Sequence, residues 1–330
     1  MESHHFDMLS SDGKYIYIYN WFPSPSEWEG PPRGVVQIAH GMAETARRYE
    51  RLARALTTQG YVVYANDHRG HGRTAGTHEE LGRPGTDGFN AMVNDMILLG
   101  AIIKDKHPET PLLLLGHSMG SFLTQKVMYT WPDPYAAFML SGTCGKRGML
   151  QFGEQVARMQ IALQGERHPS LLLNALVFGG YNRTFRPVRT AFDWLSRDDG
   201  EVDKYIADPE CGVISSAGFF RDFFRLLQEI HTPSRMERIP KDKPVYLFSG
   251  EEDPVGMKGD GVRLLHRRYQ ELGLQDVECR LYPGARHEIL NEINRDEVTA
   301  HLIDWMNQRI PLPESARPDP VSTAVEDNSP

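Results

Sequence analysis

The sequence contains few cysteines and shows no pairing pattern among them. Only three occur in 330 residues, at Cys144, Cys211 and Cys279. An odd number of widely spaced cysteines argues against a disulfide framework and against a cysteine-based zinc site. We therefore expect a protein of a reducing compartment, with a cytoplasmic location as the best fit.

Long apolar runs and basic clusters are also missing. No apolar stretch is long enough to span a bilayer, and the polar segment Met1 to Leu9 lacks the regions of a signal peptide. The formal net charge is −8, and no Lys/Arg cluster is interleaved with aromatic residues, which argues against nucleic acid as a partner. We expect a soluble protein, and peripheral contact with a membrane surface stays open.

Strand and helix patterns alternate through the first part of the chain. This alternation is the signature of a parallel, doubly wound α/β sheet, and an early hairpin of 6–9 with 15–19 is expected at its edge. A length of 330 residues suits one large domain that carries an insertion. The expected strands are 34–40, 61–66, 112–116 and 136–141, and the expected helices are 47–59, 89–107 and the segment after Ser118.

The regular alternation breaks after residue 145. About ninety residues pass before the next clear strand at 244–250, far more than an ordinary α/β connection needs. Helical patterns at 149–163, 170–177, 187–195 and 219–230 predict an inserted helical cap. The expected organisation is a core of 1–146 and 233–312, a cap or lid of 147–232, and a disordered tail of 313–330 rich in Pro, Ser and acidic residues.

The last cap helix carries a strongly apolar stripe. Its members recur at i, i+3, i+4 and i+7. Such a stripe either packs in the core of the cap itself or lines a tunnel that binds an acyl chain, and the sequence does not decide between the two. The residues are Phe220, Phe223, Phe224 and Leu227.

The segment from Leu112 to Gly120 reads L-L-L-L-G-H-S-M-G. It predicts a buried strand followed by the G-x-S-x-G turn known as a nucleophile elbow, in which glycines permit a sharp crossing from strand to helix. Ser118 is therefore the candidate nucleophile. Met119 opens the next helix, so its backbone N–H can stabilise negative charge on an attacked carbonyl.

Three other loops supply candidate partners, each after a predicted strand. His40-Gly41-Met42 follows an early strand, and the N–H of Met42 is the candidate second oxyanion donor. Asp253 is the choice among three neighbouring acids for orienting the base, because Pro254 fixes the turn there. His287 is the candidate general base, since the chain order serine, acid, histidine, each in a loop after a strand, is the one expected on a scaffold with this elbow.

A polar loop at Asp67 to Arg73 holds one aspartate and two histidines within five positions, His68 and His71 being the histidines. This set could ligate zinc, but it lacks a remote third histidine motif. We favour a hydrogen-bonded loop that braces the floor of the active site. We expect neither a metal nor a cofactor.

With these motifs the chain resembles the α/β-hydrolase superfamily, in particular its monoacylglycerol lipase and lysophospholipase branch, which includes serine aminopeptidases. The resemblance covers nearly all of 6–310. It depends on H-G-M-A-E from His40, D-H-R-G-H-G from Asp67, G-H-S-M-G from Gly116, S-G-E-E-D-P-V from Ser249 and G-A-R-H-E-I-L-N-E from Gly284.

The resemblance implies a mostly parallel eight-stranded sheet with flanking helices and a helical lid over an acyl channel. It also implies Ser118, Asp253 and His287 as a catalytic triad and the amides of Met42 and Met119 as oxyanion donors. Two departures bear on the alcohol side of the substrate. Thr45 stands where relatives often have histidine, and the lid looks longer than in the mammalian enzymes. The lid sequence at 192–198 looks more like that of bacterial lysophospholipases.

The expected function is hydrolysis of a lipid carboxylic ester, a monoacylglycerol or a lysophospholipid, through an acyl-enzyme. The same scaffold supports short-chain carboxylesterases and serine aminopeptidases, and the fold alone cannot separate them. A non-catalytic ligand receptor that has kept the pocket is the alternative from another class. The sequence leaves open the acyl length, the head group, the oligomeric state and the role of Cys144.

Overall fold

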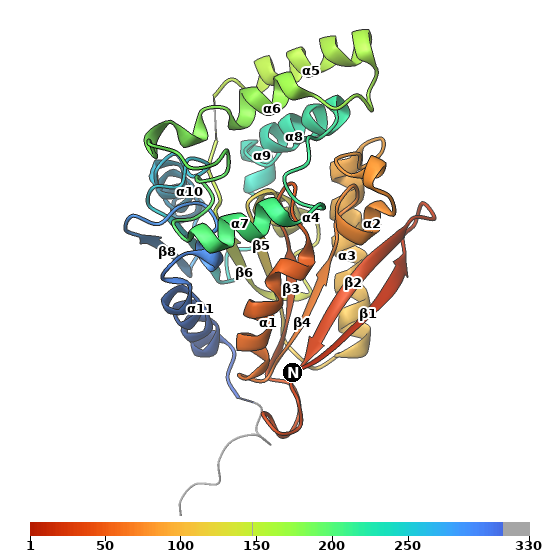
Figure 1. The fold of residues 1–330 in the computed structure, drawn as a ribbon. Coiled ribbons are helices and arrows are strands. Elements are labelled where there is room, and N and C mark those ends of the chain that lie inside the picture. Colours follow the sequence, from red (N-terminus) through yellow and green to blue (C-terminus); the bar gives the residue numbers. More distant parts are fainter. Residues whose placement is uncertain (147, 313–330) are drawn as a thin grey trace, which may run out of the picture.

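A computed structural model describes residues 1–146 and 148–312 (Figure 1). The described residues form an eight-stranded sheet in the order β1-β2-β4-β3-β5-β6-β7-β8. β1 pairs with β2 and β2 with β4 in antiparallel fashion, and the other neighbours are parallel. The strands are β1 Glu2–Leu9, β2 Tyr15–Phe22, β3 Gly34–Ala39, β4 Tyr61–Asn66, β5 Leu112–His117, β6 Tyr135–Ser141, β7 Val245–Gly250 and β8 Val277–Tyr282.

Helices cover both faces of this sheet. Every residue of β3, β4 and β5 is buried, which explains why these strands read as continuous apolar runs rather than as alternating ones. α3, α4 and α10 pack on one face, and α1 and α11 pack on the other. The bounds are α1 Glu50–Thr57, α2 Gly72–Ala75, α3 Gly88–Lys106, α4 Met119–Thr130, α10 Asp260–Glu271 and α11 Arg295–Arg309, with 3-10 turns η1 Ala46–Tyr49, η2 His78–Glu80 and η4 Ile289–Asn291.

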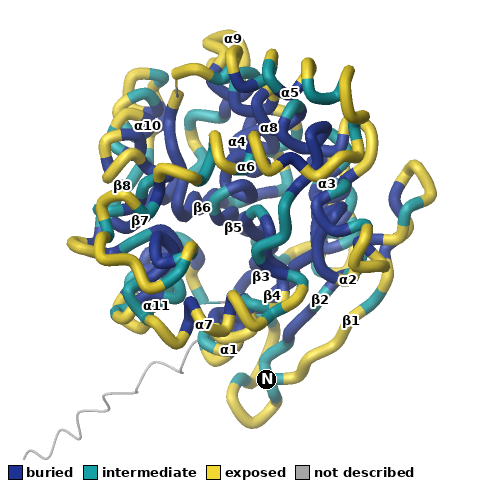
Figure 2. Tube along the Cα trace, turned by 45° about the horizontal axis from the view of Figure 1, so that its top comes forward, coloured by how far each residue is buried: buried dark blue, intermediate teal, exposed yellow. Residues whose placement is uncertain are grey.

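The expected helical insertion lies between β6 and β7. In Figure 1 it covers the upper part of the molecule, and Figure 2 shows α8 buried while much of α5 is exposed. α8 connects the insertion to the core, because Phe219 packs on Phe89 of α3 and Phe223 on Phe122 of α4. The elements are α5 Leu150–Gln164, α6 Leu171–Phe178, η3 Tyr181–Thr184, α7 Asp199–Ala207, α8 Ala217–Glu229 and α9 Pro233–Met236.

The prediction of a helix at 187–195 is wrong, and the structure has turns there. The side chain of Asp193 accepts hydrogen bonds from the backbone N–H groups of Arg189 and Thr190. Local side-chain bonds of this kind compete with the helical hydrogen-bond pattern. A helix that the sequence analysis missed, α7, follows a few residues later.

α7 begins with a recognisable signal. Asp198 caps it and accepts hydrogen bonds from the N–H groups of Gly200 and Glu201. An aspartate followed three residues later by glutamate resembles the capping-box pattern at a helix start. The sequence therefore contains a signal for the start of α7, but α7 itself has too few apolar residues to give a clear helical periodicity.

The disordered tail predicted for 313–330, and residue 147 at the expected lid boundary, lie outside the described residues. Within the described ranges, none of the helices combines the length and the apolar character that crossing a membrane requires.

Candidate active site

Ser118 stands on a strained turn between β5 and α4. Its φ is 51° and its ψ is −119°, a conformation that non-glycine residues rarely adopt. The turn is possible because Gly120 lets α4 cross directly over the end of β3. A side-chain carbon at Gly120 would lie 2.0 Å from the carbonyl oxygen of Ala39, and one at Gly116 would lie 2.4 Å from that of Gly120. Both glycines of the elbow are therefore sterically required.

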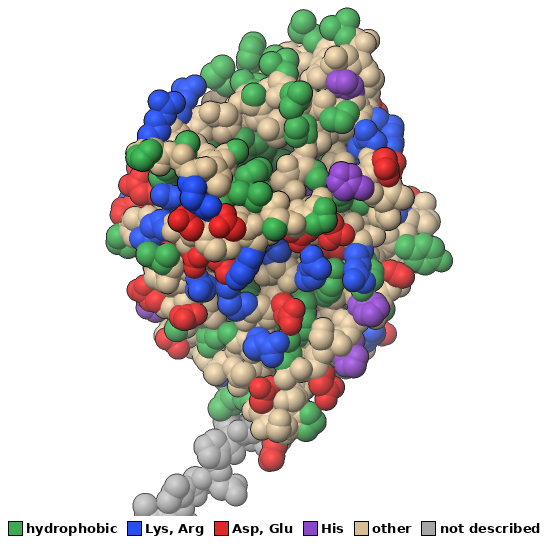
Figure 3. Space-filling view, in the orientation of Figure 1, with side chains coloured by type: hydrophobic (Ala, Val, Ile, Leu, Met, Phe, Trp, Pro, Cys, Tyr) green, Lys and Arg blue, Asp and Glu red, His purple; other side chains and the backbone are tan. Residues whose placement is uncertain are grey.

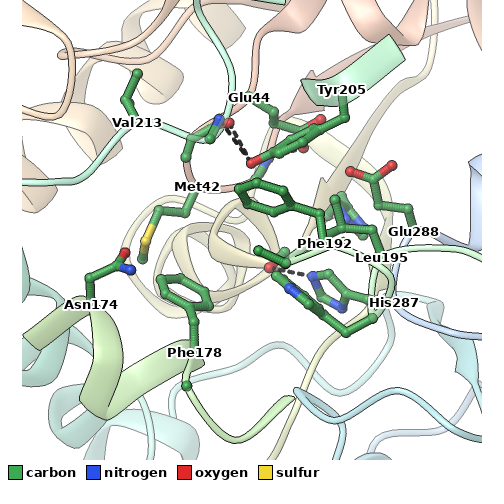
Figure 4. A pocket seen from close by; sticks show the side chains of 18 of the residues that line it. Met42, Glu44, Asn174, Phe178, Phe192, Leu195, Tyr205, Val213, His287 and Glu288 are labelled. Atoms are coloured by element: carbon green, nitrogen blue, oxygen red, sulfur yellow. Dashed lines mark hydrogen bonds between the residues drawn. The ribbon is translucent and has the colours of Figure 1, made fainter. Parts of the chain in front are cut away.

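A continuous line of hydrogen bonds joins the three polar side chains that the sequence analysis selected. The Nε2 atom of His287 lies 2.8 Å from the hydroxyl oxygen of Ser118 (dashed line at His287 in Figure 4). Its Nδ1 atom lies 3.0 Å and 2.9 Å from the two carboxylate oxygens of Asp253. Three loops separated by up to 169 positions in the chain thus meet above the sheet.

Asp253 is fully buried and its carboxylate is fixed by further donors. The hydroxyl of Ser249 donates to one oxygen at 2.9 Å, and the N–H of Val255 donates to the other at 2.8 Å. Burial alone would raise the pKa of Asp253, but the charge and the hydrogen bond of His287, together with these donors, hold it below its ordinary value. Asp253 is therefore a carboxylate at neutral pH.

His287 is nearly as deeply buried, at 2% exposed. Burial lowers its pKa, but the neighbouring carboxylate of Asp253 outweighs burial, so the net pKa lies above the ordinary 6.5. The ring lies between two other rings, with centroids 4.8 Å from that of His117 and 5.1 Å from that of Trp194. The imidazole is thus held in one orientation, with Nδ1 towards Asp253 and Nε2 towards Ser118.

The loop after β3 passes directly beside Ser118. A side-chain carbon at Gly41 would lie 3.3 Å from the Cβ atom of Ser118. The carboxylate of Glu44 accepts the N–H of Gly41 at 2.6 Å, which fixes the turn that presents Met42 to the cavity. Met119 lies at the start of α4, where backbone N–H groups have no partner within the helix. The structure thus brings the loops of both candidate oxyanion donors to Ser118.

A buried arginine joins this loop to the loop of His287. One guanidinium nitrogen of Arg48 lies 2.7 Å from Glu44 and 2.6 Å from Glu288, and the other lies 2.7 Å from Glu288. Burial would raise the pKa of Glu288, but Arg48 lowers it well below the ordinary 4.5. Arg48 also lies over the ring of Tyr205, a residue of α7.

Tyr205 ties the cap to the same loop. Its hydroxyl donates to the carbonyl oxygen of Ala43 at 2.8 Å and accepts the N–H of Gly212 at 3.1 Å (Figure 4). The N–H of Gly212 also reaches the carbonyl oxygen of Ala43, at 2.9 Å. Ala43 itself has a φ of 55°, so this part of the loop adopts an unusual conformation that the cap holds in place.

Ser118 and His287 open into a cavity of about 320 Å³ under the cap. Figure 4 shows Glu44 and Glu288 on one side of it and Asn174 and Phe178, both from α6, on the other. Its remaining walls are mostly apolar. The residues of the cap that line it include Ala175, Phe178, Phe192, Trp194, Leu195 and Val213.

The apolar stripe of α8 does not reach this cavity. Phe220 is fully buried, and Phe223, Phe224 and Leu227 line a second cavity of about 200 Å³ between α5, α6 and α8. α6 separates the two cavities, since Asn174 and Phe178 face the first and Leu176 and Val177 face the second. That the stripe binds an acyl chain stays a prediction.

The loop from Asp67 to Arg73 is held by hydrogen bonds beside the site. Asp67 accepts the N–H groups of Ala46 and Arg73, both at 2.8 Å, and the N–H of His68 donates to Nε2 of His40 at 2.9 Å. Burial lowers the pKa of His71 to about 3 and of His40 to about 4, so both rings are neutral. The loop therefore has the bracing geometry that the sequence suggested.

Sequence reasoning did not find Arg48, Tyr205 and the aromatic residues contributed by 178–194. Glu44 and Glu288 belonged to recognised motifs, but nothing in the sequence indicated that one arginine bonds to both. Arg48 and Glu288 are 240 positions apart. A signal for this pairing would have to come from residues that vary together in related sequences.

Comparisons with known proteins agree with this geometry. The sequence profile of the family described as "Serine aminopeptidase, S33" matches residues 30–294. A monoacylglycerol lipase of Mycolicibacterium smegmatis is 32% identical over 280 residues, covering 83% of this chain and 88% of that protein. The human monoglyceride lipase is 29% identical, covering 94% of this chain and 93% of its own.

Among solved structures, a highly thermostable carboxyl esterase from Bacillus coagulans, in complex with glycerol, superposes with a TM-score of 0.86. It is 28% identical in sequence, and the match covers 94% of this chain and all of that chain. The expected α/β-hydrolase fold is thereby confirmed.

The pairing of Glu288 with Arg48 predicts acid sensitivity. The pKa of Glu288 is lower in the folded state than in the unfolded state. The ionised Glu288 therefore contributes to the free energy of unfolding above about pH 4.5, and this contribution is lost as the pH falls below that value. Glu288→Gln should therefore flatten the decline in the free energy of unfolding between about pH 5 and pH 2. Urea titrations at several pH values measure this. Exposed Glu237→Gln is the matched control, and an unchanged slope in Glu288→Gln would contradict the prediction.

Proposed function

This chain belongs to the serine aminopeptidase S33 family, and we propose that it hydrolyses lipid esters, monoacylglycerols first among them, by using Ser118, His287 and Asp253 as a catalytic triad. Its relatives and its α/β-hydrolase fold identify it as a carboxylic ester hydrolase. The observation that carries the proposal is the unbroken hydrogen-bonded line from Ser118 through His287 to Asp253 at the floor of a cavity.

The first half of the proposed reaction forms an acyl-enzyme. Nε2 of His287 accepts the hydroxyl proton of Ser118 while the serine oxygen bonds to the ester carbonyl carbon. Asp253 stabilises the imidazolium that results. The N–H groups of Met42 and Met119 donate to the oxyanion of the tetrahedral intermediate. As the intermediate collapses, the bond to the alcohol oxygen breaks, and His287 gives its proton to the departing alcohol.

The second half releases the acid. A water molecule enters the position of the alcohol, and His287 takes a proton from it as its oxygen bonds to the acyl carbon. The second tetrahedral intermediate uses the same two amides. Its collapse breaks the bond to Ser118, and the proton on His287 returns to the serine oxygen. No cofactor is needed for any step.

The two sides of the cavity suit the two halves of a monoacylglycerol. The carboxylates of Glu44 and Glu288 lie on one side and can accept hydrogen bonds from the hydroxyls of an alcohol. The apolar residues of α6, Ala175 and Phe178, lie on the other side and suit an acyl chain. In this arrangement a longer chain extends past α6 towards the second cavity, which Phe223, Phe224 and Leu227 line.

The cap of 147–232 acts in this proposal as a lid. It supplies most of the apolar wall of the cavity, and it is held to the core through α7, through α8 and through residues 193–197, which bond to the loop after β8. Its α5 and α6 bear many exposed apolar side chains, which Figure 3 shows gathered at the top of the molecule. They include Phe152, Met159, Leu163, Leu171 and Leu172, and Met149 just before α5 adds to them; these side chains are 54% to 83% exposed. A surface of this kind fits weak contact with a membrane.

The assignment of Ser118 predicts a complete loss of turnover on its removal. Ser118→Ala should lower kcat for 1-monoacylglycerol by about five to six orders of magnitude without unfolding the protein, because the other triad members cannot act without the nucleophile. Exposed Ser26→Ala is the control.

A panel of monoacylglycerol, lysophospholipid, short p-nitrophenyl ester and amino-acid amide ranks the substrates. Turnover of the amide above the esters would favour an aminopeptidase, and activity retained by Ser118→Ala would refute the triad.

The pKa of His287 predicts the acid limb of the pH profile. The base must be neutral to accept a proton, so kcat/KM should rise with pH through the pKa of His287, which lies above 6.5. Asp253→Asn removes the carboxylate that raises this pKa and leaves burial, which lowers it. The limb should therefore move to lower pH while kcat falls by about ten-thousandfold. An acid limb that stays in place would show that Asp253 is not the residue setting the pKa.

The exposed apolar residues of α5 predict binding to vesicles. Met159→Glu combined with Leu163→Glu should reduce flotation of the protein with phosphatidylcholine liposomes, since it places charge on the surface proposed to meet lipid. Hydrolysis of a soluble short ester should not change. Leu9→Glu, on an exposed position of β1, is the matched control. Equal flotation of the wild type and both variants would refute membrane contact through the lid.

A further inference from the structure

β8 forms one edge of the sheet, and among the described residues no other strand pairs with its outer side. It lies at the border of the molecule in the views of both Figure 1 and Figure 2. Five of its six residues are partly exposed. An open edge of this kind presents backbone N–H and C=O groups that can pair with another strand.

The pairing with β7 fixes which backbone groups face outwards. The carbonyl oxygens of Asp276 and Tyr282 accept the N–H groups of Val245 and Glu251, both at 2.9 Å. Backbone groups alternate in direction along a strand, so the even-numbered residues of β8 face β7. Val277, Cys279 and Leu281 therefore present their backbone groups to the free edge. Of these groups, the carbonyl of Val277 already contacts Nε2 of His266 at 3.2 Å.

Two opposite charges lie on one face of β8, two positions apart. Glu278 and Arg280 point to the side of α11, since Glu278 reaches Arg309 at 3.8 Å. They are 39% and 40% exposed, and within the chain they approach each other only to 3.8 Å. Both side chains are thus partly exposed and engaged only in long ion pairs of 3.8 Å, so each can also reach a partner placed against the edge.

We propose that β8 pairs with β8 of a second copy of this chain, antiparallel, about a two-fold axis at Cys279. In this register Glu278 lies opposite Arg280 of the partner subunit, and Arg280 lies opposite the partner's Glu278. The outward-facing residues then meet in hydrogen-bonded pairs, with Val277 opposite the partner's Leu281. Both cross-strand charge pairs are favourable, and the two sheets continue into one.

Neighbouring registers are unfavourable for identifiable reasons. An axis at Arg280 places two arginines directly opposite each other, and an axis at Glu278 does the same with two glutamates, both of which are destabilising. An axis at Leu281 brings Pro283 opposite Cys279, and proline has no N–H to donate to the ladder. The charge pattern of β8 therefore selects the register centred on Cys279.

The charges of β8 allow a swap experiment. Sedimentation velocity of the wild type at 1–100 µM should show a monomer–dimer equilibrium. Glu278→Arg alone and Arg280→Glu alone should each raise the dimer dissociation constant about tenfold or more, because each places like charges opposite each other twice. An equimolar mixture of the two variants should regain dimers. One chain then carries arginine at both 278 and 280 and the other carries glutamate at both, so both cross-strand pairs are again of opposite charge.

The register also predicts a cross-link. Residues in a hydrogen-bonded antiparallel pair have Cα atoms about 5.5 Å apart, so Cys279 lies opposite the partner's Cys279. A short bismaleimide should join two wild-type chains, and Cys279→Ser should abolish the product while Cys144 and Cys211, both buried, remain.

A wild type that stays monomeric at 100 µM would overturn the proposal. Dimers that ignore both charge reversals, or that fail to cross-link through Cys279, would place the interface elsewhere. Because β8 lies apart from Ser118, every variant should keep the specific activity of the wild type on a soluble ester, so failure of the dimer and failure of the triad are distinguishable.

Discussion

The steric contact between the first turn of α4 and the end of β3 is the constraint on which the candidate site depends. Because Gly120 has no side chain, the helix crosses against the carbonyl of Ala39, and this crossing forces Ser118 into its rare backbone conformation. The hydroxyl then points out of the sheet to His287 rather than into the core. The same crossing brings the loop of Gly41 against Ser118, so one close approach sets the positions of both the candidate nucleophile and the loop of the candidate oxyanion donor Met42.

Charge in this site is paired and buried rather than exposed to solvent. Asp253 stays ionised because His287 and two donors compensate for its burial, and Glu288 stays ionised because Arg48 does so. Burying a charge costs several kcal/mol unless it is paired and hydrogen-bonded, so each member holds its neighbour in place. Arg48 thereby joins the loop after β3, which presents the candidate oxyanion donor Met42, to the loop after β8, which carries His287.

The sequence predicted most of the core but less of the cap. Strands such as β4 and β7 appear within one residue of the expected ranges because apolar patterns and glycine or proline punctuation are local properties of the chain. The candidate triad residues, which the structure brings within hydrogen-bonding distance, were selected from motifs and chain order. The turns at 187–195 were not predicted, since Asp193 competes with helical bonds through contacts that apolar periodicity does not reveal. The link from Arg48 to Glu288 depends on folding of distant segments and has no local signal.

The hydroxyl of Tyr205 donates to the carbonyl of Ala43 and so couples the cap to the loop after β3. It joins α7 to the segment that presents Met42, so a cap that swung away at α7 would dismantle the oxyanion loop in the same movement. If the cap opens as the proposed lid, the α5 and α6 end, whose apolar side chains are exposed, is therefore the end that can move without disturbing this loop. In such a motion the α7 end would stay anchored to the core, and the end with the exposed apolar side chains would move.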